Sequence, residues 1–561
     1  MTKNCSSKHR HEKCREESCV KKISANKFLS GSGFIIDKPG AYRLCGDITF
    51  SPNANSVSAI TIMVSDIDLS FEGFTLSQSS GSRTADNFGI LINKNVENVK
   101  IHDGSIIGFS ASSIRGQEGL TNIEISDMDL QGSSQGITVI NEPGAAGVYL
   151  VGTLASVNTI VKITNVLVHG FLANSLTIID QTVRGIWLAF TNDVTITDNR
   201  VYDMRFTGIA SQVFPPISGI YGYSFFSGSN YTFLRNVAAD FVANGPNDSD
   251  GLATSDVLGF LATGTLFDAP ANNFVIKQNT VSGLTGTRRS EGFVMAIDVH
   301  QYVIDDNTAE NNLLLDINNP GIQSRNGFEI LGAPGVGVPS RITLSNNRVL
   351  NMHDGILISN ASDVVVQKAV VIANRDTLNT LAEVYGILIS GSDVSTDITI
   401  EDSIIQGFQG AESAPSGALV PTNGLGISVT ALSTVSGSGL GINIRRNKVT
   451  RCNGGIVLRS GQVNGDTIVD SNEVAFNTII GIENTMNPAP TIPPLTKDLI
   501  IRNIAYNNGI LVTPQYPQGS QYAINTGNTV NQVLFQMNQM AQFPPIVANN
   551  ASLMSNYDLR P

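Results

Sequence analysis

Apolar and polar side chains alternate in short runs along most of this chain. In one recurring motif, apolar residues at alternate positions are followed by a polar step that often contains Asn, as in Val194–Asn199, Phe274–Asn279 and Ile342–Asn347. Period-two alternation indicates β-strands, because successive side chains of a strand point to opposite faces. The pattern therefore predicts many short strands that end at polar corners.

A second motif, in which Gly and an apolar residue open another alternating run, follows most copies of the first. It occurs at Gly89–Ile92, Gly136–Val139, Gly185–Leu188, Gly327–Ile330, Gly355–Ile358, Gly386–Ile389 and Gly455–Leu458. Gly and Asn tolerate left-handed backbone angles, which suits them to tight corners. Asn at equivalent corners can also stack into a hydrogen-bonded ladder.

The motifs repeat with a short period. Val99 and Ile123 are 24 residues apart, and Ile342 and Val364 are 22 apart; longer spacings, such as the 43 from Asn236 to Asn279, fit one coil plus an insertion. A leucine-rich repeat has a similar period, but its Leu/Asn consensus is absent. Stacked coils bury a core that one coil cannot bury alone. We therefore predict an all-β fold, a β-solenoid of roughly 13–16 coils.

Length and composition agree with a solenoid. The chain has 561 residues, whereas one compact core supports about 250–300. A solenoid avoids this limit because each added coil lengthens its core. Only 15% of the residues are charged, and 53 are Gly. Abundant Gly disfavours helices, and the low charge with many β-branched residues disfavours disorder.

The motifs V-x-I-x-x-N-x-V and G-I-x-I resemble the repeats of right-handed, single-stranded parallel β-helix (pectin-lyase-like) proteins over about residues 60–510. That family includes pectate lyases, polygalacturonases, alginate epimerases and phage tailspikes. The phrase at residues 502–509 is similar to uncharacterised members from large DNA viruses and amoeba-associated bacteria. The resemblance implies a right-handed parallel β-helix and a virion or extracellular surface location.

The repeat predicts four segments. Residues 1–24 form a charged tail, 25–75 entry or cap strands, 76–510 the parallel β-helix, and 511–561 a capping or oligomerisation segment. The last segment loses the repeat and carries several prolines. Val530, Leu534, Met537 and Met540 lie there near helical spacing, which predicts a short capping or subunit-contact helix or a lid over the core.

The N-terminal tail has no apolar segment of a standard secretion signal, so we expect a cytosolic, virus-assembled or unconventionally exported protein. No run approaches the roughly 18 apolar residues of a membrane span. Thiol and imidazole groups cluster in the tail and could bind Zn²⁺. They belong to Cys5, His9, His11, Cys14 and Cys19. A disordered tail and disulfides among its cysteines are the alternatives.

The net charge of −12 disfavours nucleic-acid binding, and a polyanion would need local Arg or Lys. The expected partners are a polysaccharide or glycan surface, or further copies of the chain in a homo-oligomer. No cofactor is required. The segment Asn247–Gly251 is rich in oxygen ligands for Ca²⁺, but it lacks a later bidentate Glu and reads better as a solvated loop.

The signatures of the family's enzymes are missing: N-T-D, G-H-G and R-I-K of polygalacturonases, W-I-D-H of pectate lyases and D-P-H-D of alginate epimerases. The best local candidates for catalysis are Asp298, His300 and Arg289, with His353–Asp354 as a second element. Asp and His on one strand face could transfer a proton to a bound sugar. Ordinary corner and outward residues are the alternative.

Aromatic residues crowd one region of a chain that has few. Alternation places Tyr221, Tyr223 and Phe225 on one strand face, and Trp187 opposite the aliphatic Ile186 and Leu188. An exposed aromatic row would bind sugar rings or another subunit. The alternative is a coil interior filled by aromatic stacks.

Two classes of function remain. The first is a non-enzymatic structural or surface-recognition protein of a virion or cell surface, with glycan binding as one role. The alternative is a polysaccharide-active enzyme, a lyase, hydrolase or epimerase. An Arg and several carboxylates that converge in an open groove would favour the enzyme.

Overall fold

The structure is a computed structural model of the chain. It describes residues 20–79, 85–133, 145–174, 182–207, 219–245, 255–264, 270–314, 325–333, 336–373, 384–391, 395–409, 424–430, 441–458, 467–485, 497–508, 520–525, 532–536, 539–540, 546–548, 551–554 and 557–558.

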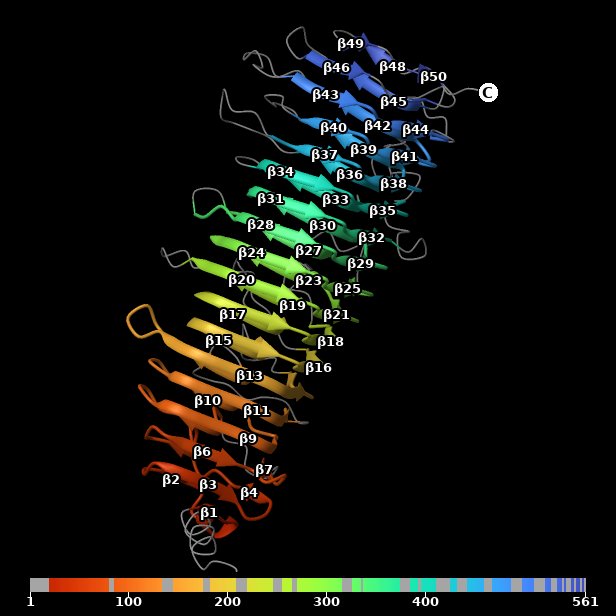
Figure 1. The fold of residues 1–561 in the computed structure, drawn as a ribbon. Helices are drawn as coiled ribbons and strands as arrows, with labels where there is room; N and C mark the ends of the chain where they lie inside the picture. Colours follow the sequence, from red (N-terminus) through yellow and green to blue (C-terminus); the bar gives the residue numbers. More distant parts are fainter. Residues whose placement is uncertain are drawn as a thin grey trace, which may run out of the picture. The chain divides into compact units, whose positions relative to one another are not determined.

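The described part of the chain is all-β, apart from one 3₁₀ turn at Ala25–Phe28. Each strand pairs in parallel with the strand one coil before it and the strand one coil after it, which is the pattern of a parallel β-helix (Figure 1). None of the described residues forms a helix with the length and apolar character needed to cross a membrane.

The chain divides into two compact units. Unit 1 comprises residues 1–232 and 241–248, and unit 2 comprises residues 233–240 and 249–561. Strand β18 (Val237–Ala243) contributes residues to both. Each unit is built from three sheets, here called the first, second and third sheet.

Unit 1 begins the coil pattern. Its first sheet contains β2 (Phe34–Ile36), β5 (Ser58–Ile62), β8 (Phe88–Ile92), β10 (Ser112–Gly116), β12 (Ala145–Val151), β15 (Thr182–Thr197) and β17 (Gly219–Leu234). Its second sheet contains β1 (Lys21–Ile23), β3 (Gly40–Leu44), β6 (Ile67–Ser70), β9 (Glu97–Ile107), β11 (Thr121–Gln131), β13 (Asn158–His169) and the later halves of β15 and β17. Its third sheet contains β4 (Ile48–Phe50), β7 (Thr75–Gln78), the later halves of β9, β11 and β13, β14 (Leu172–Ala173) and β16 (Arg200–Phe206).

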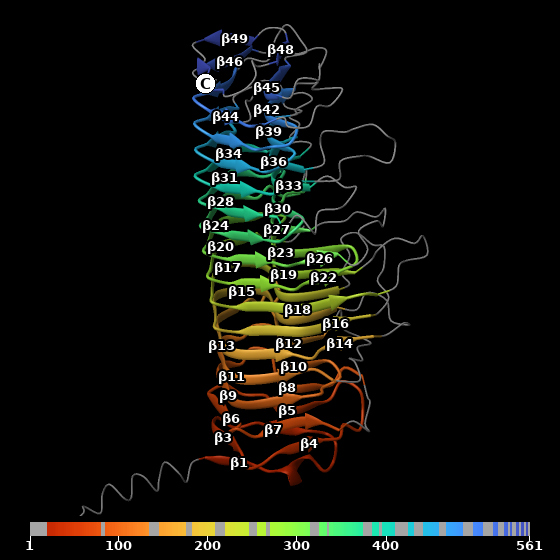
Figure 2. The ribbon, with the colours of Figure 1, turned by 90° about the vertical axis from the view of Figure 1, so that its right-hand side faces the viewer.

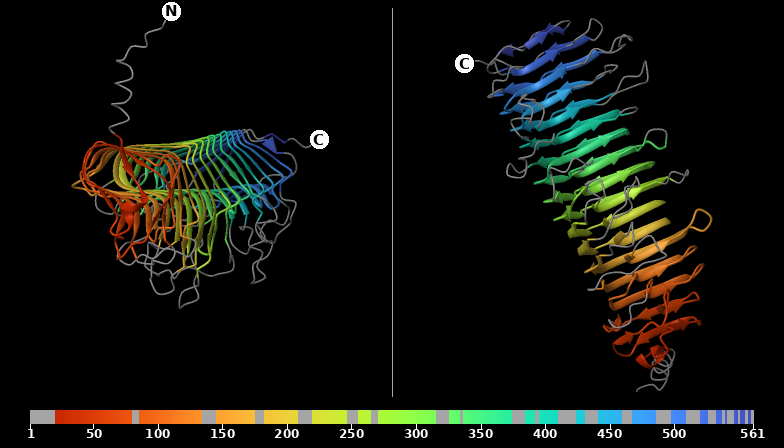
Figure 3. Two further views of the ribbon diagram at one scale, coloured as in Figure 1. Left: turned by 90° about the horizontal axis from the view of Figure 1, so that it is seen from below. Right: turned by 180° about the vertical axis from the view of Figure 1, so that it is seen from behind.

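Unit 2 repeats the pattern, as Figures 2 and 3 show from further sides. Its first sheet contains β19 (Asp256–Thr263), β23 (Arg289–Ala296), β27 (Asn326–Leu331), β30 (Asp354–Ser359), β33 (Val384–Ser390), β36 (Gly424–Val429), β39 (Gly454–Leu458), β42 (Ile480–Thr485), β45 (Ser520–Asn525) and β48 (Ile546–Ala548). Its second sheet contains β20 (Ala271–Lys277), β24 (Val299–Asp305), β28 (Ser340–Ser345), β31 (Ser362–Gln367), β34 (Thr396–Glu401), β37 (Asn443–Arg445), β40 (Ile468–Asp470), β43 (Lys497–Ile501), β46 (Gln532–Gln536) and β49 (Ala551–Met554).

The third sheet of unit 2 is made of short strands. It contains β21 (Thr280–Ser282), β25 (Thr308–Glu310), β29 (Arg348–Leu350), β32 (Val370–Ile372), β35 (Ile404–Gln406), β38 (Lys448–Thr450), β41 (Glu473–Ala475), β44 (Ile504–Tyr506), β47 (Gln539–Met540) and β50 (Tyr557–Asp558). Two further pieces, β22 (Thr285–Gly286) and β26 (Leu313–Leu314), pair with each other.

The predicted period is confirmed by the strand register. Val99 lies opposite Ile123, and Ile342 lies opposite Val364. The inward side chains of these strands are buried, and aromatic rings stack from coil to coil, as where Phe293 and Phe328 lie 4.8 Å apart. The period-two pattern therefore sorts side chains between core and surface as expected.

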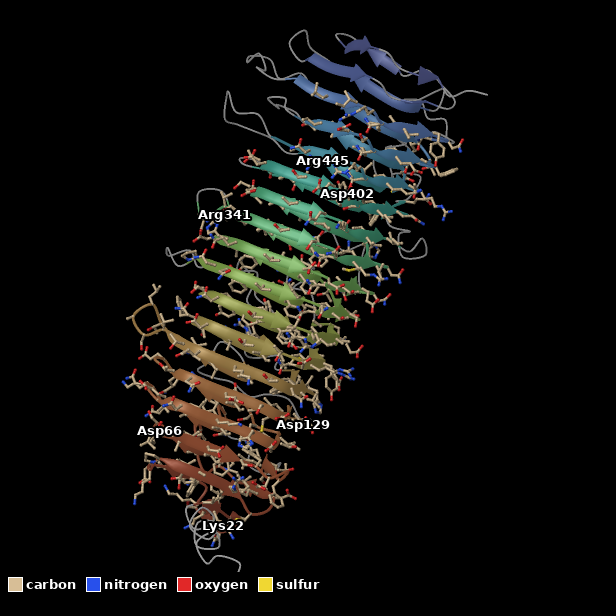
Figure 4. The ribbon with its side chains drawn as sticks, in the orientation of Figure 1. Lys22, Asp66, Asp129, Arg341, Asp402 and Arg445 are labelled. Atoms are coloured by element: carbon tan, nitrogen blue, oxygen red, sulfur yellow. The ribbon has the colours of Figure 1, made fainter. Side chains whose placement is uncertain are left out.

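The corners follow the predicted chemistry. Positive backbone φ angles recur at the turns, at Asp66 and Arg341 where strands of the second sheet begin and at Asp402 where one ends; Figure 4 labels all three. Inside one corner of unit 2, each Asn accepts a hydrogen bond through Oδ1 from the backbone N–H of the preceding Asn. The pairs are Asn236–Asn279, Asn279–Asn307, Asn307–Asn347, Asn447–Asn472 and Asn472–Asn503. The predicted Asn ladder is confirmed.

The C-terminal segment differs from expectation. Instead of a helix, the described residues beyond 519 form strands β45 to β50, and Leu534 and Met540 lie in β46 and β47. Val530 and Met537 lie outside the described residues. The helix prediction was wrong because the preceding coil offers a row of free backbone groups: Leu534 pairs with Leu499 of β43. These added coils bring the first sheets of the two units to seventeen strands, more than the coils predicted.

Candidate functional site

The predicted Asp–His pair is brought together at a corner of unit 2. His300 Nε2 lies 2.9 Å from Asp298 Oδ1, and His300 Nδ1 lies 2.8 Å from the Ser340 hydroxyl. Asp298 sits in the turn between β23 and β24 with φ of 53°, a strained angle for a residue other than Gly. Both side chains are 22% exposed, so the pair is accessible to a solute.

Arg289 does not join this pair, and its predicted place in one catalytic group with Asp298 and His300 was wrong. It begins β23, whereas Asp298 follows the end of that strand at Ala296. At about 3.3 Å per residue the strand separates them by roughly 23 Å. Neighbours in sequence along an extended strand are thus far apart in space.

Arg289 instead belongs to a buried ionic group in the first sheet of unit 2, here called the charged cluster. Its members are Asp256, Arg288, Arg289, Glu291 and Glu329. Arg289 Nη2 donates to Glu291 Oε2 and to Glu329 Oε2, each at 2.7 Å. The carboxylate side chains are at most 4% exposed. Glu291, Glu329 and Asp256 were not predicted, because only strand register brings β19, β23 and β27 together.

The charged cluster contains three carboxyl groups and two guanidinium groups. One bound proton makes it neutral, which matters because an unpaired buried charge is costly. Burial and the neighbouring Glu291 carboxylate raise the pKa of Glu329 well above its ordinary range, despite Arg289. Burial therefore favours the protonated form of the Glu329 carboxyl group, and it also raises the pKa of Asp256.

The second predicted element, His353–Asp354, is buried beside Arg325. Arg325 Nε lies 3.4 Å from Asp354 Oδ2. Burial and the positive charge of Arg325 lower the pKa of His353 to about 4. His353 is thus neutral at pH 7, and its Nδ1 atom has no hydrogen-bond partner. The pair is an interior feature of the sheet and not an exposed acid–base couple.

The aromatic side chains of Tyr221, Tyr223 and Phe225, predicted to share one strand face, are buried. Tyr223 is completely buried and its hydroxyl donates to the backbone oxygen of Asn199 at 3.0 Å. Phe225, 2% exposed, packs edge-on against Tyr231 with ring centroids 5.5 Å apart. These two residues therefore follow the alternative prediction and lie in the coil interior, where burial of their large aromatic surface stabilises the fold.

Trp187 faces away from the aliphatic core, as its alternation with Ile186 and Leu188 predicts, but it too is covered. It is 8% exposed and forms a separate cluster with Ala146 and Tyr149. The rings of Tyr149 and Trp187 lie 4.5 Å apart, edge to face. The predicted exposure of Trp187 was therefore wrong, although its direction was correct.

Two arginines complete this outer face of unit 1. Strand register aligns Arg115, Tyr149 and Trp187, and the Arg115 guanidinium lies 4.7 Å from the Tyr149 ring. The Arg184 guanidinium lies 3.3 Å from the Trp187 ring and 5.3 Å from that of Tyr221, itself 5% exposed. We call Arg115, Tyr149, Arg184 and Trp187 the aromatic row. Neither arginine was predicted as a site residue.

Arg184 is an unusual member of the aromatic row, because it is a buried cation. It is 4% exposed, and its Nε and Nη1 atoms have no hydrogen-bond partner. Burial lowers its pKa to about 10, with Tyr221 and Tyr149 opposing the shift, so it stays charged at neutral pH. Cation–π contact with Trp187 offsets part of the cost of burial.

An open hollow of about 530 Å³ borders the aromatic row at the ends of β8, β10 and β12. Its lining includes both charged and uncharged polar groups and the Tyr149 ring. The residues are Asn93, Lys94, Arg115, Gly116, Gln117, Glu118, Tyr149, Val151, Gly152 and Thr153. Tyr149 and Val151 also pack in the cluster of Trp187. The hollow and the aromatic row are thus contiguous.

The predicted metal sites are not located. Cys5, His9, His11, Cys14, Cys19 and the segment Asn247–Gly251 lie outside the described residues. Within the part of the chain that the structure describes, no group of three or more His, Cys, Asp or Glu residues is arranged to hold a metal ion.

Comparison with known proteins supports the fold. Residues 263–438 match the family described as "Right handed beta helix region". The fold is a right-handed parallel β-helix. No curated protein sequence matches the chain.

Several solved structures are similar at low sequence identity. A variant of the periplasmic alginate epimerase AlgG has 12% identity and a TM-score of 0.37, covering 80% of this chain and 82% of its own. The A-module of an Azotobacter vinelandii mannuronan C-5 epimerase has 11% identity and a TM-score of 0.28, covering 96% and 93%. An endo-xylogalacturonan hydrolase from Aspergillus tubingensis has 15% identity and a TM-score of 0.27, covering 79% and 97%. Because one fold hosts many functions, function rests on the sites themselves.

Proposed function

We propose that the protein binds polysaccharide at a virion or cell surface, and that the glycan lies on the outer face of the first sheet of unit 1. The observation that carries this proposal is the open hollow of about 530 Å³ beside the aromatic row. Its volume falls within the about 300–1,000 Å³ typical of ligand sites.

The lining of the hollow suits a sugar. Tyr149 and Val151 offer apolar surface, on which the carbon-bound hydrogens of a pyranose ring pack. Gln117, Asn93 and Arg115 offer hydrogen-bonding groups for its hydroxyls. A few convergent polar groups around an apolar floor fix the orientation of a small ligand.

The hollow favours binding over catalysis. Among its lining residues, Glu118 is the one carboxylate. Glycoside hydrolysis generally requires a pair of carboxyl groups about 5–9.5 Å apart. A single carboxylate among neutral and basic groups is therefore better suited to recognition of the polymer than to its cleavage.

The test is a binding screen of the full chain against neutral and acidic polysaccharides by affinity electrophoresis. Tyr149→Ala and Arg115→Ala should each weaken binding of a retained polymer by about tenfold. Lys162→Ala, on the outer face of β13 in the second sheet, serves as the control and should leave retention unchanged. Absence of retention by every polymer, or equal retention of all four proteins, would contradict the proposal.

A polysaccharide-active enzyme is the second candidate, and the charged cluster of unit 2 favours it. Glu329, whose pKa is raised by burial and by Glu291, lies beside the Glu291 carboxylate and Arg289, so the cluster contains a candidate acid, a candidate base and a fixed positive charge. This arrangement is typical of sites that transfer protons. The side chains of Arg288 and Arg289 are the most exposed of the five, at 16% and 19%.

This second candidate predicts release of shortened or altered products from a polysaccharide. Glu329→Gln should abolish that release if the charged cluster is the centre, whereas Asp298→Asn should abolish it if the Asp298–His300 pair is. If only one of the two variants loses product release, the residue changed in that variant identifies the catalytic site. No products from the unmodified protein over the whole screen would exclude this candidate for the polymers tried.

A further inference from the structure

Arg184 is a buried cation without a carboxylate partner in the part of the chain that the structure describes. In the described residues no carboxylate forms an ion pair with it, and its Nε and Nη1 atoms remain without acceptors. The chain treats a comparable residue differently: Arg289, in the first sheet of unit 2, is paired with the carboxylates of Glu291 and Glu329. An uncompensated buried charge is costly, so an external anion that reached Arg184 would be bound favourably.

We infer that Arg184 is an anion-binding residue, whose partner is a carboxylate or sulfate group on the polysaccharide held by unit 1. This inference rests on the proposed function and adds the chemical class of the ligand. It assigns to the aromatic row a role in choosing acidic over neutral polymers.

The aromatic neighbours hold Arg184 without using its hydrogen-bond donors. The Trp187 ring lies 3.3 Å from the guanidinium carbon, and the rings of Tyr221 and Phe226 lie at 5.3 Å. A guanidinium that contacts rings through its face keeps its N–H bonds, which lie in its plane, available to an anion. The stacking therefore orients the cation while leaving acceptor positions for a ligand.

The path to Arg184 starts in the hollow. Lys94 and Arg115 line it and supply the local positive charge that an acidic polymer needs against the net charge of −12. Glu118 lines it as well and accepts a hydrogen bond from Thr153. Tyr149 connects the hollow to Trp187. Phe226, which is half-buried, packs against the same cluster.

The experiment compares polygalacturonate with its carboxyl-reduced form and adds dextran sulfate and dextran as a second pair. Trp187 is the single tryptophan of the chain, so its fluorescence reports on ligand at the aromatic row. Polygalacturonate or dextran sulfate should bind at least tenfold more tightly than its neutral counterpart. Preference within the first pair identifies a carboxylate ligand, and preference within the second a sulfate ligand.

Two variants separate recognition from stability. Arg184→Met removes the buried charge and keeps the length of the side chain, so thermal stability should be unchanged or higher, while the tenfold preference is lost. Arg184→Lys retains the charge and should retain part of the preference. This opposite movement of stability and affinity is not expected of a structural arginine.

Three results would overturn the inference. Equal binding of charged and neutral polymers by the unmodified protein would refute it while leaving polysaccharide binding intact. A preference that survives in Arg184→Met, shown to be folded by circular dichroism, would refute it as well. Failure of every polymer to bind would refute both the inference and the proposed function.

Discussion

At the scale of single residues, burial decides which ionisable groups keep a proton. Glu329 lies beside the Glu291 carboxyl group in the charged cluster, and its side chain is 4% exposed. The unfolded chain exposes the same carboxyl to water, where it ionises with an ordinary pKa near 4.5. At a pH between 4.5 and the raised pKa of the folded state, the folded protein therefore binds one proton more at Glu329 than the unfolded chain does.

This difference predicts a pH-dependent stability. The contribution of Glu329 is fully present below about pH 4.5 and is lost as the pH rises toward the raised folded pKa, with a slope of up to about 1.4 kcal/mol per pH unit. Glu329→Gln keeps a neutral group of the same shape and should remove this slope. Urea unfolding between pH 5 and 8 measures it.

Glu124→Gln, on the outer face of β11, is the matched control and should retain the slope of the unmodified protein. If the slope of the Glu329→Gln variant also equals that of the unmodified protein, another group binds the proton and its assignment to Glu329 is wrong.

At the scale of elements, a column of glycines explains why the second sequence motif opens with Gly. In unit 2 a Cβ atom on each glycine would meet the backbone oxygen of the glycine in the next coil, as at Gly292 and Gly327, 2.4 Å. The glycines with this contact are Gly259, Gly292, Gly327, Gly355, Gly386, Gly426 and Gly455, and the oxygen of Gly481 ends the series. Gly is required in this motif because the backbones of stacked coils approach closely and leave no space for a Cβ atom. A left-handed backbone angle at the glycine is not the reason.

Gly355→Ala is the sharpest test of this column. The added Cβ would lie 2.1 Å from the Gly386 oxygen and 2.4 Å from a methyl carbon of Val371, so both strands must shift. We expect a loss of about 3 kcal/mol, at the upper end for overpacked cores. Leu357→Ala, partly exposed on the same strand, should cost less. Equal losses in thermal unfolding would contradict the steric explanation.

At the scale of the whole molecule, stability is a sum of local contributions. In a solenoid each coil contacts only its neighbours, so a defect in one coil weakens its surroundings and not the entire chain. The division into two compact units adds to this independence. A multi-unit chain need not unfold in one cooperative step.

The single tryptophan makes this testable. Trp187 lies in unit 1 and Gly355 in unit 2, so Gly355→Ala should lower the unfolding midpoint seen by circular dichroism. The midpoint seen by tryptophan fluorescence should stay where it is in the unmodified protein. Equal shifts of both signals would show instead that the units unfold together.

Much of the fold could be predicted because it depends on local chemistry that repeats. Period-two alternation identified the strands, Asn identified the corners, and the spacing of 22 residues between Ile342 and Val364 is the register of β28 and β31. The segment at Leu534 could not be predicted in the same way. Its own pattern is ambiguous, and pairing with Leu499 in the preceding coil decides its conformation.

The candidate sites depended more on tertiary structure. The sequence alone identified Asp298 with His300, which are two residues apart across a corner, and the outward direction of Trp187. It could not identify Glu329 as the partner of Arg289, 40 residues away, or Arg184 as a cation without a carboxylate partner among the described residues. Strand patterns determine on which side of a sheet a residue lies, whereas burial, charge pairing and cavities depend on which coils stack on it.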